Sequence, residues 1–171
     1  MSTYATAEQA LLTLVRAYSG GVFTSTNSSV DDWRVLDANG TDAAAVLEMA
    51  GASVEREVTN SRDARSYGDY GEYQEVHQIG VWICIKRGQG LGGDGAAKAA
   101  CKTLTEAVKD YLRGYRRLNG ATSVRAALIL KTTELSYISP TRDIADATHV
   151  AQEIILEIAC ESDAPDGEMD G

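Results

Sequence analysis

The chain has 171 residues, and 44% of them are hydrophobic, which suits one globular domain with its own core and argues against global disorder. The formal net charge is −9, whereas a free-standing nucleic-acid binder would carry the opposite balance. The N-terminus has no basic leader before its apolar residues, so we expect no signal peptide and no membrane span.

The first predicted element is a helix over residues 5–18, where apolar residues recur at helical spacing. Thr6 is its candidate N-cap, and Gln9 occupies the capping-box position three residues later. Residues 19–32 then have the composition of a loop, and residues 33–37 form a short run that is compatible with a strand.

Two strands are predicted next. The alanine content of residues 43–51 favours a helix, but the shortness of the run and the glycine that ends it favour a strand, which we predict. Residues 75–87 are the clearest strand, because one of the two alternating faces is wholly apolar and the other is mixed. The apolar face contains Ile79, Val81, Ile83 and Ile85.

Residues 55–75 lack a sustained period and are rich in Arg, Tyr and Gly. Two interpretations stay open for this stretch, a solvated or disordered loop and a loop that docks on a partner. Tyr and Arg favour docking, because they bury a large area at modest entropic cost. The candidate contact residues of this extended loop (about 56–75) are Arg62, Arg65, Tyr67, Tyr70 and Tyr73.

A long amphipathic helix is predicted over residues 94–118, with Asp94 as its N-cap and a stop at Asn119-Gly120. The region carries six bases and three acids, so the remainder of the chain is strongly acidic. The basic face is either solvated or meets an acidic face of a neighbouring copy. Further candidate contact residues at its C-terminal end are Arg113, Arg116 and Arg117.

The C-terminal third is predicted to contain one strand over residues 122–139 and a last strand over residues 148–160. The last eleven residues carry five acids and no base, which is the composition of a disordered tail. We therefore expect one domain over residues 1–162 and an acidic tail over residues 163–171.

The glycines in 88–93 match the G-x-G-x-x-G dinucleotide fingerprint. The fingerprint needs an acidic residue about twenty positions further on, but Arg113 stands there, and repeated β-α-β units are missing. A flexible strand-to-helix turn is the favoured interpretation. The two histidines (His77 and His149) and three dispersed cysteines form no recognisable catalytic or metal grouping, so we expect no enzyme activity and no cofactor. The cysteines are read as small core residues in a reducing cytosol.

The order of these elements resembles the tail terminator (tail completion) proteins of long-tailed bacteriophages. The matching segments are "TAEQALLTLVRAY", "AAAVLEMAG", "EYQEVHQIGVWICI", "AAKAACKTLTEAVKDYLRGYRRLNG", "VRAALILKTTELSYI" and "THVAQEIILEIACESD". The resemblance spans most of residues 5–162 and departs at the loop of residues 56–75 and at the acidic tail.

The resemblance implies a single α/β domain whose mixed, mainly antiparallel sheet is flanked by an N-terminal helix and one long internal helix. It also implies a virion protein that is assembled in the host cytoplasm, in which six copies form a ring on the tail tube. The ring would end tube polymerisation, contact the major tail tube protein and a head–tail connector or neck protein, and let DNA pass through its lumen. The alternatives are a related neck (head completion) protein and a small nucleotide-binding enzyme that uses the glycine loop.

Overall fold

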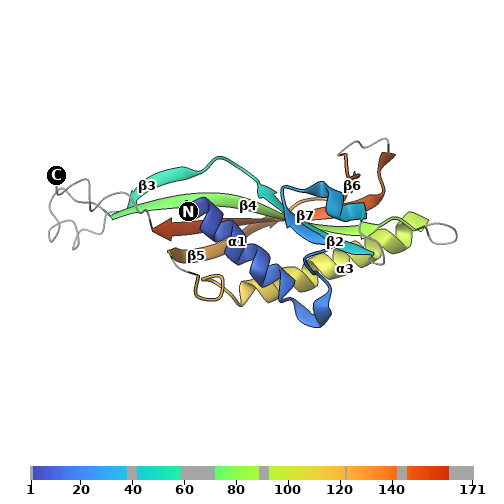
Figure 1. The fold of residues 1–171 in the computed structure, drawn as a ribbon, viewed down its shortest axis with the longest axis horizontal. Coiled ribbons are helices and arrows are strands. Elements are labelled where there is room, and N and C mark those ends of the chain that lie inside the picture. The colour runs from blue at the N-terminus through green and yellow to red at the C-terminus, as the bar shows by residue number, and fades with distance from the viewer. Residues whose placement is uncertain are drawn as a thin grey trace.

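Two α-helices and seven strands follow one another in the described chain (Figure 1). The computed structural model describes residues 2–37, 42–58, 72–88, 93–121, 123–141 and 146–161. The elements are α1 (Thr3–Arg16), η1 (Ser19–Gly21), β1 (Ser28–Val30), η2 (Trp33–Asp37), β2 (Ala43–Met49), β3 (Val54–Val58), β4 (Glu72–Lys86), α3 (Gly93–Arg113), β5 (Val124–Thr132), β6 (Ser136–Ile138) and β7 (His149–Glu161).

The strands form one sheet in the order β1-β2-β4-β7-β5. β3 pairs with β4 beyond the end of β2, and β6 pairs with β7 beside β5. β1 and β2 run parallel, and the other described pairs run antiparallel. The predicted fold class, a single α/β domain with a mixed and mainly antiparallel sheet and two flanking helices, is confirmed.

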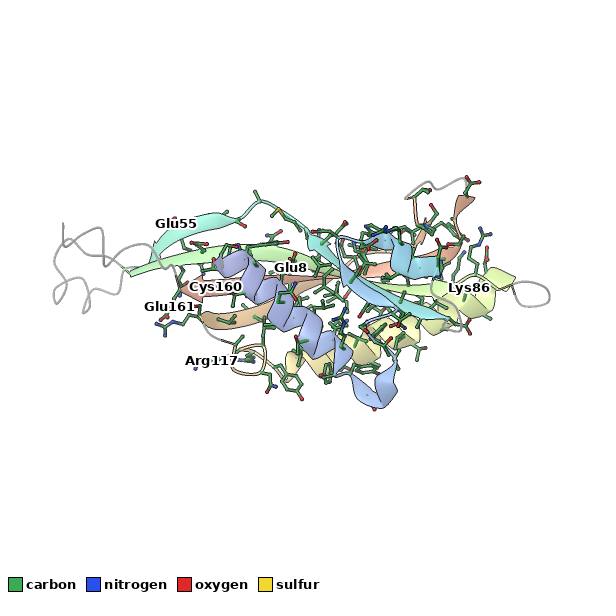
Figure 2. All side chains as sticks on the ribbon, in the orientation of Figure 1. Glu8, Glu55, Lys86, Arg117, Cys160 and Glu161 are labelled. Atoms are coloured by element: carbon green, nitrogen blue, oxygen red, sulfur yellow. The ribbon has the colours of Figure 1, made fainter. Side chains whose placement is uncertain are left out.

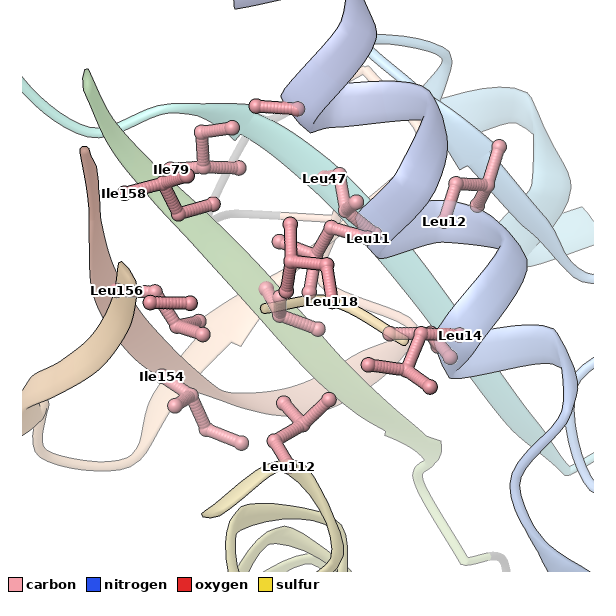
Figure 3. Packing of buried hydrophobic residues seen from close by; sticks show 14 of the residues in the cluster. Leu11, Leu12, Leu14, Leu47, Ile79, Leu112, Leu118, Ile154, Leu156 and Ile158 are labelled. Carbon is pink, nitrogen blue, oxygen red and sulfur yellow. The ribbon is translucent and has the colours of Figure 1, made fainter. Parts of the chain in front are cut away.

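The main core lies between one face of the sheet and the two helices α1 and α3 (Figure 3). Successive side chains of the long central strands β4 and β7 point to opposite faces of the sheet, so that every second residue points towards the helices. Burying each large aliphatic side chain stabilises the fold by about 1.5–3 kcal/mol. The fully buried strand residues of this core include Ile79, Val81, Ile83, Ile154 and Ile158.

The opposite face of the sheet is covered at one end by η2. Trp33 packs there with its ring centroid 5.7 Å from that of Trp82, in an edge-to-face arrangement. On β5, Leu128 follows the buried Ala127 and is 51% exposed on this second face. Gly80 lies on the same face, where a Cβ atom would force the side chain of Glu153 to move.

The first helix begins earlier than predicted. Ser2, rather than Thr6, is the N-cap, because its Oγ accepts a hydrogen bond from the amide of Ala5 at 3.1 Å. The Thr6 hydroxyl donates instead to the carbonyl of Ser2 at 3.1 Å. The earlier start allows Thr3 to be buried against β4, a long-range contact that residues 5–18 alone do not reveal.

Two predictions in the next segment were wrong. The predicted loop of residues 19–32 contains β1, which pairs with β2, and residues 33–37 form the 3₁₀-helix η2 instead of a strand. Trp33 and Leu36 are three residues apart, so they project from the same side of a 3₁₀-helix and are both buried. The prediction of a strand in residues 43–51 is confirmed by β2.

The prediction of an irregular loop over residues 55–75 was wrong at both ends. β3 pairs in antiparallel fashion with the start of β4, from the pair Val54–Val76 to the pair Val58–Glu72. The ladder partner of each segment lies far along the chain, which a local periodicity cannot reveal. Residues 59–71 lie outside the described residues.

In the second half of the chain, the helix and strands begin or end at other residues than predicted. The helix α3 ends at Arg113, and Gly93 rather than Asp94 begins it. The single strand predicted over residues 122–139 is two strands, β5 and β6, which both pair with β7. The strands predicted at residues 75–87 and 148–160 are confirmed by β4 and β7.

Glu8 on α1 is a buried carboxylate whose Oε2 has no hydrogen-bond partner among the described residues. Burial raises the pKa of Glu8, although a hydrogen bond from Tyr4 opposes the shift. Ionised Glu8 therefore destabilises the native state at a pH above the pKa of Glu8 in the folded protein. This destabilisation disappears as the pH falls through that pKa and Glu8 becomes neutral. We expect Glu8→Gln to raise the free energy of unfolding at about pH 7.5 by about 1 kcal/mol.

The test is urea unfolding of both proteins at about pH 7.5 and about pH 4. The gain of the Gln variant should shrink at the lower pH, where Glu8 is itself neutral. The exposed Glu134→Gln substitution is the control and should change stability by less than about 0.5 kcal/mol at either pH. An equal gain in the free energy of unfolding at both pH values would show that the charge of Glu8 is not the cause.

Candidate interaction surface

The chain leaves α3 through a turn of residues 113–121, which we call the arginine turn. Three consecutive residues in it have positive φ angles, Leu118 at 49°, Asn119 at 59° and Gly120 at 79°. A leucine in this region is strained by roughly 1–2 kcal/mol, so surrounding contacts must hold it there. The turn is therefore fixed by tertiary packing rather than by local preference.

Packing and backbone bonds account for this conformation. The Leu118 side chain is 3% exposed and lies in the main core. The amides of Gly120 and Ala121 both donate to the carbonyl of Arg117, each at 3.1 Å. The amide of Ala127 on β5 donates to the carbonyl of Arg116 at 2.6 Å, which joins the turn to the outer edge of the sheet.

The arginine turn carries the exposed cations at the end of α3. Arg113 forms an ion pair with Asp110 at 2.9 Å, and earlier in the helix Lys109 pairs with Glu106 at 2.7 Å. Arg116 and Arg117 are exposed, and neither side chain has an ion-pair partner among the described residues. Figure 2 shows Arg117 projecting from the body of the molecule. The basic face predicted along the helix is thus partly neutralised by acids of the same helix, and Arg116 and Arg117 lie just beyond its end.

The structure brings together three of the eight predicted contact residues, Arg113, Arg116 and Arg117. The backbone of Tyr73 lies in β4 opposite Glu57, but its side chain is outside the described part of the chain. The remaining four predicted contacts also lie outside the described residues, and they are Arg62, Arg65, Tyr67 and Tyr70. That these eight residues contact a partner stays a prediction.

Sequence reasoning missed a charged pair beside the arginine turn. Arg125 on β5 forms an ion pair with Glu161, the last residue of β7, and the amide of Glu161 donates to the carbonyl of Ser123 at 2.8 Å. The two charged residues are distant in sequence, and only the pairing of β5 with β7 places them together. The acidic composition after Glu161 was the available signal, but it does not reveal the neighbour.

The glycine segment connects β4 to α3, as the favoured interpretation expected. Arg87 forms a two-pronged ion pair with Asp94 in the first turn of α3, with both nitrogen–oxygen distances at 2.9 Å. These hydrogen bonds hold the pKa of Asp94 below its usual range. A carboxylate of the chain itself therefore lies at the helix N-terminus, where a nucleotide phosphate would otherwise be favoured.

A cavity of about 330 Å³ adjoins this segment and is lined by Lys86, Arg87, Gly88, Ala147 and Thr148. The Arg87 guanidinium, 5.1 Å from the Tyr137 ring centroid, is engaged with that ring as well as with Asp94. Lys86 is thus the second cation of the cavity. Among the described residues that line it, none would select the base or the sugar of a nucleotide. We assign it no ligand.

His77 is buried in a chain of hydrogen bonds that joins α1, the β2–β3 connection and β4. Its Nδ1 lies 2.7 Å from the Ser53 hydroxyl, and its Nε2 lies 2.9 Å from the Thr3 hydroxyl, which donates to Glu75. Burial lowers the pKa of His77, with the nearby Glu75 opposing the shift. Both ring nitrogens are thus engaged in links between elements.

A comparison with protein-family models finds no match to this chain, and a comparison with curated proteins finds none either. Within the described ranges, no helix is long and apolar enough to cross a membrane. Within the same ranges, no group of three or more His, Cys, Asp or Glu side chains is placed to hold a metal ion. The three cysteines are buried with free thiols, in agreement with the prediction that they are core residues.

Proposed function

We propose that this chain is a structural virion protein that self-associates into a ring on the tail tube of a long-tailed phage. The ring would end tube polymerisation and present the surface that joins the head connector. Two arguments support the proposal, the order of elements in the sequence and the arginine turn. The arginine turn carries most weight, because it exposes Arg116 and Arg117, which have no ion-pair partner among the described residues, on a chain of net charge −9.

A head-to-tail ring needs two different, complementary patches on each subunit. The arginine turn supplies a basic patch, and the acidic remainder of the chain supplies candidate surfaces for its counterpart. Complementary charge steers association and fixes the register of the contact. Six subunits, the tube and connector partners, the virion location and passage of DNA through the lumen are parts of this proposal that rest on the resemblance.

The double substitution Arg116→Glu/Arg117→Glu tests the proposal. Because like charges at a close interface cost several kcal/mol, we expect self-association to weaken by about a hundredfold or more. The measurement is native mass spectrometry together with negative-stain imaging of the protein mixed with tail tubes. The wild type should form rings and cap the tubes, whereas the variant should do neither and keep its circular dichroism spectrum.

The matched control is Arg34→Glu/Lys131→Glu, which changes the charge equally at two exposed positions away from the turn. This control should still form rings and cap tubes. A wild-type protein that stays monomeric and leaves tube length unchanged would refute the proposal. Rings that bind the head connector but not the tube would identify a neck protein instead.

A further inference from the structure

We propose that Ser53 is a nucleophile with His77 as its general base, so that the chain hydrolyses small carboxylic esters at the connection between β2 and β3. The inference goes beyond the proposed function and does not depend on it. It rests on hydrogen bonds that join Ser53 and His77 to Thr3 and Glu75. These residues come from three separate parts of the chain, which is why the sequence by itself predicts no catalytic grouping.

The direction of these hydrogen bonds makes Nδ1 of His77 the basic nitrogen. The Thr3 hydroxyl donates its one proton to the Glu75 carboxylate, so its oxygen can only accept from the ring. Nε2 of His77, 2.9 Å from that oxygen, therefore carries the single ring proton of a neutral imidazole. Nδ1 is left with a lone pair, which accepts a hydrogen bond from the Ser53 hydroxyl at 2.7 Å.

His77 is held in one orientation and is uncharged at neutral pH. Its side chain is 2% exposed, and the Tyr4 ring lies edge-to-face with it at a centroid distance of 5.3 Å. Burial lowers the pKa of His77, with Glu75 opposing the shift, so the ring is neutral at about pH 7.5. When His77 takes a proton, the Glu75 carboxylate stabilises the imidazolium, because its Oε2 lies 3.6 Å from Nε2.

The arrangement has the parts of an activated nucleophile. A serine hydroxyl lies within hydrogen-bond reach of a base, and a third group orients that base. Ser53 is exposed, so a substrate outside the molecule can reach it. Among the described residues, the amides of Ala52 and Ser53 donate to no backbone carbonyl. They are therefore available to donate to the negative oxygen that forms when a carbonyl carbon is attacked.

The exposure of Ser53 determines the class of substrate. An exposed site excludes little water, so it stabilises the developing charge less than an enclosed site does. A carboxylic ester with a good leaving group needs less of this stabilisation than an amide. We therefore assign small esters rather than peptide bonds to this site.

The reaction is ester hydrolysis in two steps. Oγ of Ser53 attacks the carbonyl carbon, and its proton passes to Nδ1 of His77. The bond to the alcohol then breaks, and the alcohol leaves with that proton while the acyl group stays on Ser53. Water attacks the acyl group and passes a proton to His77, which returns it to Ser53 as the carboxylic acid departs. Thr3 and Glu75 do not contact the reacting atoms, so they are positioning residues.

Labelling with a fluorophosphonate probe tests the nucleophile. An activated serine hydroxyl attacks the phosphorus of the probe and displaces fluoride, and mass spectrometry of the digested full chain gives the labelling rate of each serine. Ser53 should react about a hundredfold faster than the exposed Ser136 on β6, because a positioned base contributes about 10²–10⁴-fold. Equal labelling rates at the two serines would overturn the proposal, and this comparison needs no variant.

Two substitutions at Thr3 test the positioning of His77. Thr3→Val keeps the volume of this buried residue and removes its hydroxyl, so labelling of Ser53 should slow by about tenfold. Thr3→Ser keeps the hydroxyl and should label at nearly the rate of the wild type, which a role in packing alone would not require. Labelling that is unchanged in Thr3→Val, or equally slow in both variants, would contradict the assignment of Nδ1 as the base.

The ester reaction is followed with p-nitrophenyl acetate. The wild type should release a burst of about one equivalent of p-nitrophenolate as Ser53 is acylated, followed by slower turnover. Ser53→Ala and His77→Gln should lose the burst, whereas the matched control Ser136→Ala should keep it. A burst that persists in Ser53→Ala would refute the inference. Because ring formation and tube capping are not read out, that result would leave the proposed function intact.

Discussion

Replacing Leu11 with alanine is expected to lower the free energy of unfolding by about 3 kcal/mol. Leu11 is 0% exposed and lies between α1 and the sheet, where Figure 3 shows it beside Leu47 and Leu118. The loss combines the transfer free energy of the deleted atoms with the cost of the cavity that they leave. The measurement is urea unfolding monitored by circular dichroism, with the wild type under the same conditions.

The control for this prediction is Leu130→Ala on β5. Leu130 is 47% exposed, so its truncation should cost less than about 1 kcal/mol. Equal losses for the two variants would mean that α1 is not held by the packing described here. Since Leu118 anchors the arginine turn in the same core, the Leu11 variant should also weaken the proposed ring formation at temperatures where it remains folded.

Lowering the pH from about 6.5 to about 4 is expected to remove up to about 3 kcal/mol of stability through His149. His149 is 3% exposed at the start of β7, and its Nδ1 lies 2.7 Å from the Thr148 hydroxyl. Burial lowers the pKa of His149 to about 4, with Lys86 adding to the shift and the carboxylates of Asp37 and Asp42 opposing it.

The sign follows from proton uptake. In the unfolded chain His149 binds a proton as the pH falls through about 6.5, whereas in the native protein it stays neutral until about pH 4. The unfolded state therefore binds more protons in this window, and stability falls as the pH falls. His77 contributes in the same direction, because burial also lowers its pKa, while Glu8 contributes in the opposite direction.

Urea unfolding at several pH values checks this prediction. The His149→Gln variant should lose most of the pH dependence between about 6.5 and 4, whatever its stability at neutral pH. The His77→Gln variant is the comparison, and it should remove a separate and smaller part of the slope. An unchanged slope in His149→Gln would show that another group causes acid destabilisation.

The strands β4 and β7 and the helix α3 were predictable, because each is long and its apolar residues repeat at the period of the element. The failures are the short elements. The 3₁₀-helix η2 and the strands β1, β3 and β6 have three to five residues each, too few for a period to be recognised. Their structure is set by the partner on which they lie, which for β3 is the start of β4.

In the candidate interaction surface, too, some features were predictable from the sequence and others were not. The sequence alone placed Arg113, Arg116 and Arg117 in a basic stretch that ends in Asn119-Gly120, because residue type and turn signals are local properties. Only the tertiary structure ended α3 at Arg113 and held Leu118 at a positive φ, through burial of its side chain in the core.

The fold class was expected from the resemblance, whereas the two helices, the long strands and the acidic balance of the chain were determined by the sequence itself. These properties depend on composition and on patterns that repeat within one element. The ion pairs along α3 join residues three apart and follow from local spacing, whereas the tertiary structure decided which distant charges meet beside the arginine turn. Pairing β5 with β7 brought Glu161 to Arg125, and no local pattern specifies a contact between residues so far apart in the chain.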